Sequence, residues 1–582
     1  MSSARTTTAL ALAAFICGCG DDVTPAGETP TTGGTTGTLG STSSGTTSGT
    51  TGEGTSSSGD PTSGSGDTTS SESTESTTGE TEGDTTEPSV CPTVPFTTIH
   101  GVTVGGLAGW QVAGAGDFDG DGVGDYAIST PRADSGLNTD SGRVHLVRGG
   151  PSYDDFSLSE VGGRVAGWVI EGEASNHRAG DSVSGLGDIN GDGRDDLLIS
   201  SSARDPEVPF AEHGRWSVVY GVDFDSTPVD IALAEVRTGA GGFAIDGRTN
   251  AFPNLPPGGR RVGDVNVDGL SDILIGTPLL ENFAGPSAVD VIFGSEDNPG
   301  FMLIGPEGPA SGVGIEYPYD GAFHGFIVGG GGDINADGIP DILFGTGGPA
   351  GPILHVLFGG EDIGTASLED LAMGIGGFDI SLELPEILFE MPDIVEIVGD
   401  VNGDGFDDIG FEVTYPLPEM NDQAGIGIVF GKDDTGPISL LDVFEGQGGF
   451  VSTRPASDPD PSLGFNIGRA GDVNGDGFAD LLIARGADPV SALGGDNVRG
   501  RVYVAYGRDG MDALDLGAVA DERQGFIFDS PEVNDDFAQS ISAGQDVNGD
   551  GIPDVLIGAP QDGQFGTVYV LYGFDESCPR VR

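Results

Sequence analysis

Residues 546–560 read DVNGDGIPDVLIGAP, and this stretch decides the fold because the chain repeats it with small changes. The shared pattern, D-x-[DN]-x-D-G-x-x-D followed by a short apolar run, occurs seven times. Start-to-start spacings are 71, 76, 69, 67, 72 and 74 residues, and the copies begin at Asp117, Asp188, Asp264, Asp333, Asp400, Asp472 and Asp546. Self-similarity at a fixed period is typical of a repeat architecture, and each unit here is long enough for four strands and their loops.

Each repeat carries three further signals. An apolar run such as 126–129 follows the Asp-rich loop, a second run such as 144–147 ends near a glycine, and an aromatic residue then follows another glycine. In five of six repeats this aromatic lies 20 to 22 residues before the next loop, but Phe301 lies 32 residues before Asp333. We therefore expect an insertion within 306–323. Since no segment has sustained helical periodicity, the chain is predicted to be all-β.

Seven units of about four strands favour a seven-bladed β-propeller over a linear solenoid. The chain ends shortly after the run 568–572, so its last unit lacks an outer strand. Residues 96–99 supply an aromatic segment 21 residues before Asp117, where no unit precedes it. We predict that this N-terminal strand completes the last blade, because a solenoid would have no reason for such a mismatch of phase.

Three regions are expected along the chain: a signal peptide at 1–18, a tether at 19–90 and the propeller at 91–582. The apolar run 9–17 is too short to span a bilayer, and Gly18-Cys19 follows it. This resembles a bacterial lipoprotein signal, which implies acylation of Cys19; the alternative is an ordinary secretory signal. Either way we expect export, to a membrane anchor at the outer membrane or cell surface, or as a secreted protein.

The tether is almost entirely Thr, Ser, Gly and acidic residues, with 12 acidic and no basic or aromatic residues in 20–90. Such a segment cannot bury enough apolar surface to fold, so we expect a disordered, self-repelling linker. After processing at Cys19, only Cys91 and Cys578 remain as thiols. They flank the predicted seam of the ring, and an exported protein permits oxidation. A disulfide there is predicted, with two free thiols as the alternative.

The charge of the chain limits its partners. It has 92 acidic and 23 basic residues, a formal net charge of −69. Nucleic acid is excluded as a partner because phosphate binding needs clustered Lys and Arg. The only lysine, Lys432, precedes Asp433, so the chain has no G-K-[ST] phosphate loop.

The seven loops are predicted to bind Ca²⁺, up to one ion per blade. Side chains at positions 1, 3, 5 and 9 and the carbonyl at position 7 offer hard oxygen ligands without His or Cys, and Gly at position 6 permits a tight turn. This is not an EF-hand, because position 12 is apolar; the alternative is simple Asp-Gly and Asn-Gly turns. The predicted ligands are Asp117, Asp119, Asp121, Val123, Asp125; Asp188, Asn190, Asp192, Arg194, Asp196; Asp264, Asn266, Asp268, Leu270, Asp272; Asp333, Asn335, Asp337, Ile339, Asp341; Asp400, Asn402, Asp404, Phe406, Asp408; Asp472, Asn474, Asp476, Phe478, Asp480; and Asp546, Asn548, Asp550, Ile552, Asp554.

These loops and the apolar runs after them resemble the FG-GAP repeats of the integrin α-subunit head, and the resemblance covers about 91–582. It implies a seven-bladed propeller with calcium loops on its lower face and a ligand on the opposite face. The sequence departs from that family in carrying all seven loops and no inserted domain. The resemblance implies the fold and the metal far better than it implies the ligand.

Three functions are compatible with these observations. A surface-tethered adhesion or protein-interaction module is favoured, and a calcium-dependent lectin is the alternative. Trp110, Trp168 and Trp216 could stack on sugars, but their recurring strand positions favour core packing. An enzyme is least favoured, because the propeller contains no G-x-S-x-G, zinc or Cys-His motif. His145 and His355 lie in strand patterns, where we expect them to pack, and no catalytic residue is predicted.

Overall fold

The computed structural model describes one repeat domain, within the compact unit Val90–Arg582. The described residues are 95–151, 153–202, 215–223, 230–246, 259–277, 287–304, 309, 311–317, 328–348, 351–361, 363, 367–382, 392, 394–415, 423–453, 465–485, 499–519, 524–533 and 535–574.

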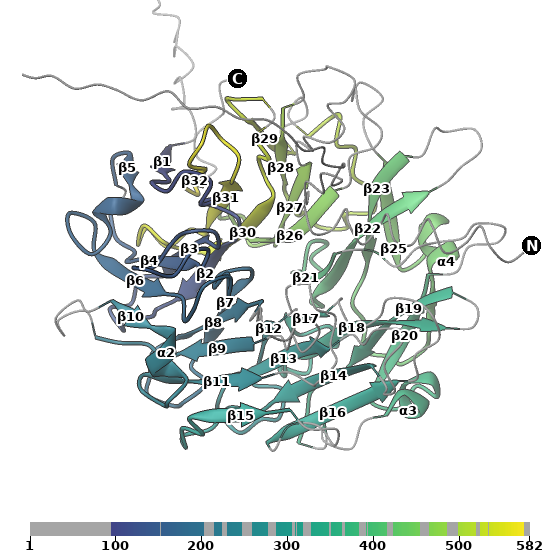
Figure 1. Ribbon diagram of the computed structural model, residues 1–582. Coiled ribbons are helices and arrows are strands. Elements are labelled where there is room, and N and C mark those ends of the chain that lie inside the picture. The colour runs from purple at the N-terminus through teal and green to yellow at the C-terminus, as the bar shows by residue number, and fades with distance from the viewer. Residues whose placement is uncertain are drawn as a thin grey trace, which may run out of the picture. The chain divides into compact units, whose positions relative to one another are not determined.

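Seven blades, each of four antiparallel strands, surround a common centre, which confirms the predicted propeller (Figure 1); in four of the sheets a short linking strand is added in parallel. In every blade the strand before the Asp-rich loop is innermost. From inner to outer strand the blades are β2 (Val112–Gly116), β3 (Asp125–Thr130), β4 (Arg143–Val147), β6 (Gly167–Glu171); β7 (Val183–Gly187), β8 (Asp196–Ser201), β9 (Arg215–Val219), β11 (Gly242–Asp246); β12 (Gly259–Gly263), β13 (Asp272–Thr277), β14 (Ser287–Ile292), β16 (Gly312–Tyr317); β17 (Val328–Gly332), β18 (Asp341–Gly348), β19 (Gly351–Leu357), β20 (Gly377–Ser381); β21 (Val395–Gly399), β22 (Asp408–Tyr415), β23 (Gln423–Val429), β25 (Gly449–Thr453); β26 (Phe465–Gly471), β27 (Asp480–Arg485), β28 (Arg501–Ala505), β29 (Gly525–Asp529); and β30 (Ser540–Gln545), β31 (Asp554–Ala559), β32 (Thr567–Leu571), β1 (Phe96–His100).

Hydrophobic cores lie between neighbouring blades. The second strand of blade two shows why: Leu197 and Ile199 pack against blade one, and Leu198 packs against blade three. Side chains alternate along a strand, so one apolar strand fills two interfaces. Seven such clusters join the seven pairs of neighbouring blades, including blades seven and one.

The N-terminal strand closes the ring, as the sequence predicts. β1 pairs antiparallel with β32, and a hydrogen bond of 2.9 Å joins the hydroxyls of Thr97 and Tyr572. The register differs by one residue from the expected match. Phe96 lies opposite Leu571, the place that a glycine takes in the other six blades, so Thr97 occupies the position of the aromatic residue.

The predicted insertion in the fourth repeat is wrong. The outer strand of blade three is β16, and its second residue, Val313, lies 20 residues before Asp333, the usual spacing. Phe301 instead begins β15 (Phe301–Leu303), a short strand that pairs in parallel with β11 of the preceding blade. The outer strand of this blade has a valine at the aromatic position, and the linking strand before it begins with an aromatic residue. The sequence pattern therefore assigned Phe301 to the wrong strand.

Short linking elements stitch neighbouring blades at their outer edges. β5 (Phe156–Ser157), β10 (Ile231–Ala232) and β24 (Ile438–Ser439) make the same kind of parallel contact as β15. Helical turns follow three of these strands or stand at the equivalent place: η1 (Leu158–Glu160), α2 (Leu233–Val236), α3 (Leu368–Ala372) and α4 (Leu440–Phe444). Among the described residues, no helix is long and apolar enough to cross a membrane.

A glycine follows the third strand of every blade because the turn leaves no room for a side chain. An added Cβ at Gly507 would lie 2.2 Å from the carbonyl oxygen of Ala479. The other six, Gly149, Gly221, Gly294, Gly359, Gly431 and Gly573, would meet a neighbouring atom at 2.2 to 2.6 Å.

We predict that Gly507→Ala lowers the free energy of unfolding by about 2–3 kcal/mol, because the turn must shift to admit the methyl group. Calorimetric melting of the full chain measures this loss. Gly468→Ala is the matched control, since its Cβ would meet nothing nearer than 3.8 Å. The prediction would be contradicted if Gly507→Ala had the same melting temperature as Gly468→Ala.

Candidate metal site: the seven aspartate loops

All seven loops lie on one face of the propeller, because each connects an innermost strand to the second strand of its blade. We call this the loop face. The glycine at position 6 of each loop has a φ between +83° and +96°, a conformation that other residues rarely adopt. It reverses the chain so that the side chains before it can fold back over the loop.

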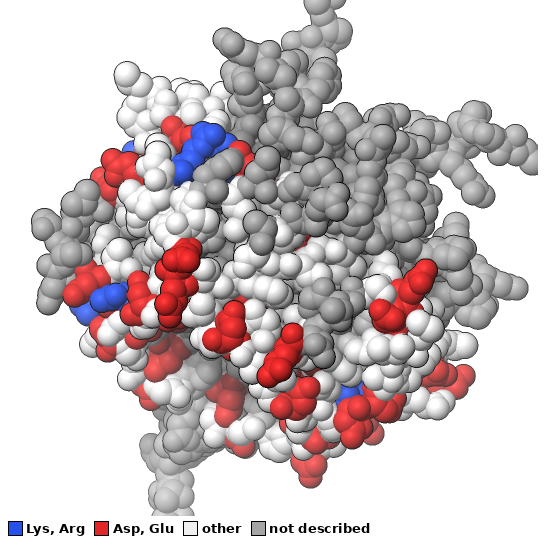
Figure 2. Space-filling model, turned by 90° about the horizontal axis from the view of Figure 1, so that it is seen from below, with Lys and Arg blue, Asp and Glu red and all other residues white. Residues whose placement is uncertain are grey.

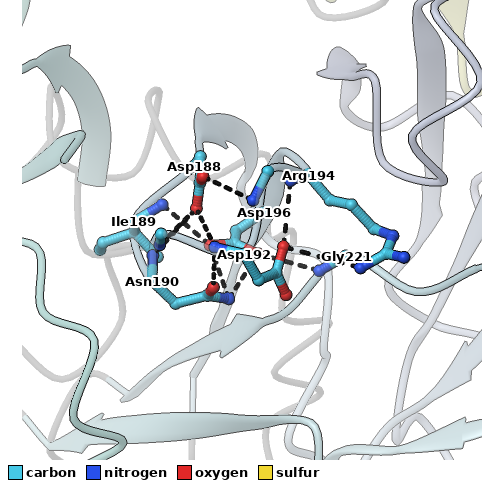
Figure 3. Close-up of polar contacts among 9 residues, drawn as sticks. Asp188, Ile189, Asn190, Asp192, Arg194, Asp196 and Gly221 are labelled. Carbon is cyan, nitrogen blue, oxygen red and sulfur yellow. Dashed lines mark hydrogen bonds and ion pairs between the residues drawn. The ribbon is translucent and has the colours of Figure 1, made fainter. Parts of the chain in front are cut away.

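The second loop shows how these side chains converge (Figure 3). Asp188 accepts the backbone N–H of Gly193 at 2.8 Å, and Asn190 accepts that of Asp192 at 2.9 Å. Asp192 in turn accepts the N–H of Arg194 at 3.0 Å. The first of these bonds recurs in all seven loops at 2.6 to 2.9 Å. Positions 1, 3 and 5 therefore gather around the loop backbone, and their role as cation ligands stays a prediction.

The aspartate at position 9 is buried in every loop. Asp196, for example, accepts the N–H of Ile189 at 3.0 Å and that of Gly221 at 2.8 Å. The equivalent pair of bonds occurs in all seven blades, and these carboxylates are at most 1% exposed. Position 9 thus ties its loop to the glycine turn after the third strand.

Burial raises the pKa of these aspartates far above the ordinary value, because a dry environment disfavours the charged form. The pKa is raised to about 8 for Asp125, Asp196, Asp408 and Asp480, and to about 7 for Asp272, Asp341 and Asp554. The backbone N–H groups act in the opposite direction, and the carboxylates at positions 1 and 5 raise it further in six of the seven loops. A cation beside these groups would favour their ionised form.

The same turns link each loop to the next blade. The residue after the turn glycine donates its N–H to the carbonyl of position 2 in the preceding blade, as Val222 does to Phe118 at 3.0 Å. All seven junctions have this bond, at 2.8 to 3.2 Å. In five junctions the N–H at position 8 also bonds the preceding position-1 carbonyl; the other two have Pro340 and Pro553 there, which lack the donor. These hydrogen bonds form a continuous ring through the seven blades, which was not predicted from the sequence. The seven glycines after the third strands are the sequence signal for it.

The donor set fits a hard divalent cation. In the first loop, one carboxylate oxygen each from Asp117, Asp119 and Asp125 lie within 4.8 Å of one another, close enough to share one positive charge, from a divalent ion or from a neighbouring guanidinium. Ca²⁺ takes six to eight oxygens, which carboxylates, amide oxygens and backbone carbonyls supply in such loops. In loops three to seven the side-chain NH₂ of the position-3 Asn donates to the position-5 carboxylate at 2.9 to 3.0 Å. The atoms of these loops that a cation could use are therefore the Asn side-chain oxygen and the Asp carboxylate oxygens. The carbonyl ligand at position 7 stays a prediction.

Other singled-out residues lie apart from these loops. Trp168 and Trp216 are core residues at 3% and 1% exposure, whereas Trp110 is half-buried. His145 and His355 are both buried in strands, as expected, and His355 bonds Asp379 at 2.7 Å and Thr346 at 2.6 Å. Cys19, Cys91 and Cys578 lie outside the described residues, so the lipid anchor and the disulfide stay predictions.

The fold and the loops define a seven-bladed propeller with acidic loops on one face. Residues 466–505 and 537–571, in blades six and seven, match the model of the FG-GAP repeat. It is 28% identical to integrin alpha-5 of Xenopus laevis over 249 residues, 41% of this chain and 20% of that protein. It is also 28% identical to integrin alpha-6 of Gallus gallus over 160 residues (27% of this chain, 12% of that protein). Phosphatidylinositol-glycan-specific phospholipase D of Bos taurus is 36% identical over 121 residues, 20% of this chain and 14% of that protein. The chain therefore spans a fifth or less of each of these relatives.

We predict that Asp480→Asn lowers the free energy of unfolding by about 2–3 kcal/mol even in chelator, because an amide replaces one of two acceptors for buried N–H groups. Asp509→Asn in the same blade is the control, since Asp509 is exposed and lies outside the aspartate loop. Thermal melts of the two variants make the comparison. If both lose the same stability, position 9 does not hold the ring as described.

Proposed function

We propose that the protein is a non-enzymatic, calcium-loaded protein-interaction module. The observation that carries this proposal is the similarity of up to 41% of the chain to integrin α subunits, on a fold that presents repeated loops on one face. The similarity to a phospholipase D does not supply a catalytic site, because no cluster of catalytic side chains stands out in the described residues. The surface seen in Figure 2 carries many acidic and few basic side chains, which favours partners other than nucleic acid.

Calcium is proposed to occupy the aspartate loops. Side-chain oxygens at positions 1, 3 and 5 fold back over each loop, as in the second loop, and burial makes the position-9 charge costly without a cation nearby. The ion would supply positive charge that balances these carboxylates. The chain's own residues fix its place by the hydrogen bonds that orient the loop.

Removal of the ion should weaken the fold. We expect chelation to lower the melting temperature of the full chain by about 5 °C or more, because a ligand bound only to the native state stabilises it. Readdition of Ca²⁺ should restore the melting temperature. Addition of Mg²⁺ instead of Ca²⁺ is the control. Identical melts in chelator and in calcium would rule out a calcium-stabilised fold.

The partner is proposed to bind the face opposite the loop face. That face carries the hairpin before β32 and the segment before β2, and these are held together by bonds from Gly101 to Gly566 and from Ala108 to Phe565. Val104 is 69% exposed and Phe565 is 42% exposed on this rigid support. Gly105 donates its N–H to the Gln564 carbonyl at 2.8 Å, which brings the segments that carry Val104 and Phe565 together. Adjoining exposed apolar side chains are typical of interaction sites.

This proposal predicts that Val104→Asp combined with Phe565→Asp reduces partner binding at least about tenfold, with an unchanged melting temperature. Surface cross-linking of the full chain would identify the partner, and titration with the purified partner would measure affinity. Met373→Asp is the control, since Met373 is 66% exposed and directly follows α3 at the outer rim. Binding of a defined glycan on an array, with no protein cross-linked, would favour the lectin alternative, for which half-buried Trp110 is the remaining stacking candidate.

A further inference from the structure

The first loop differs from the other six at two places that touch each other. Position 3 is Asp119, whereas the other loops have Asn. The residue directly after the third strand is Arg148, whereas the other blades have an aromatic residue there: Tyr220, Phe293, Phe358, Phe430, Tyr506 and Tyr572. Both exchanges occur in one blade of seven, so they form a coupled pair.

The geometry explains the coupling. Arg148 places Nε 2.5 Å from Asp119 Oδ2 and Nη2 2.6 Å from Asp121 Oδ2. Where position 3 is Asn in loops three to seven, its amide donates to the position-5 carboxylate. Asp119 cannot donate, so two carboxylates would face each other there, and the guanidinium bridges them instead. The Asp119 side chain is 1% exposed, which makes this charge pairing largely sheltered from water.

The place occupied by Arg148 borders the loop in the second blade as well. Tyr220 directly precedes Gly221, whose N–H bonds Asp196 of the same loop at 2.8 Å, and burial together with the charges of Asp196 and Asp192 raises the pKa of Tyr220 to about 12. An aromatic ring brings no charge to that place. In the second loop the ion pair between Arg194 and Asp192 is 3.9 Å long and partly exposed, so it contributes little.

We propose that Arg148 is the resident cation of the first loop, which therefore keeps its shape without a divalent ion. The inference rests on the proposed role of calcium in the other six loops. The chain then has one loop that is closed by its own guanidinium, next to the seam between blades seven and one, and six loops that depend on calcium.

Hydrogen exchange of the full chain, followed by mass spectrometry in calcium and in chelator, tests the proposal. Peptides that cover 117–125 should exchange alike in both conditions. Peptides that cover the other six loops should exchange at least about tenfold faster in chelator. If 117–125 responds to chelation as strongly as the other loops, the inference fails and the calcium proposal stands.

Reciprocal variants make the assignment specific. Arg148→Tyr with Asp119→Asn reproduces the pattern of the other loops and should make 117–125 respond to chelator. Tyr220→Arg with Asn190→Asp should protect 188–196 in chelator. If no wild-type loop responds to chelation, the calcium proposal fails. The single variant Arg148→Tyr then tests the role of Arg148 by itself. Unchanged hydrogen exchange at 117–125 in this variant would overturn that role as well.

Discussion

The buried aspartate at position 9 is the constraint on which the rest of the propeller depends. Seven carboxylates at essentially zero exposure would be costly, and each is compensated by two backbone N–H groups. One of these belongs to its own loop and the other to the turn glycine two strands later, as Ile189 and Gly221 are for Asp196. The residue after that glycine bonds the preceding blade. A single side-chain type thus fixes the loop, the turn and the blade-to-blade contact.

Closure of the ring follows from the same repetition. Each blade needs a neighbour on both sides, because its strands carry apolar residues on both faces. The cluster between blades seven and one is built from strands at opposite ends of the domain, among them Ile99 and Val568. β1 adds backbone pairing and the Thr97–Tyr572 bond at this junction. The seam is therefore held by the same packing as every other junction, with one strand borrowed from the N-terminus.

The sequence predicts the blade number and the closing strand because both depend on spacing, which the repeats make visible. It fails where packing replaces a marker residue: Val313 stands where an aromatic was expected, and Thr97 rather than Phe96 takes that position in the last blade. The site is predicted less completely. Asp is the suitable residue both for a cation ligand and for a buried acceptor of two N–H groups, so the pattern alone cannot separate these roles. The pair of Arg148 and Asp119 is visible in sequence only once the third-strand ends are aligned by structure.

The two faces of the propeller are constrained to different degrees. On the loop face, position 2, position 9 and the turn glycine all take part in the ring, so substitution in one blade disturbs the next. Redundancy is nevertheless built in, since Pro340 and Pro553 remove the position-8 bond at two junctions while the position-2 bond persists at all seven. The hairpins on the opposite face, such as 131–142 and 560–566, share a contact only at their ends, where Gly142 and Gly566 bridge Ala179 and Ala108, and their other residues differ. Variation that does not disturb the ring is available there, which is why partner specificity is better assigned to that face than to the loops.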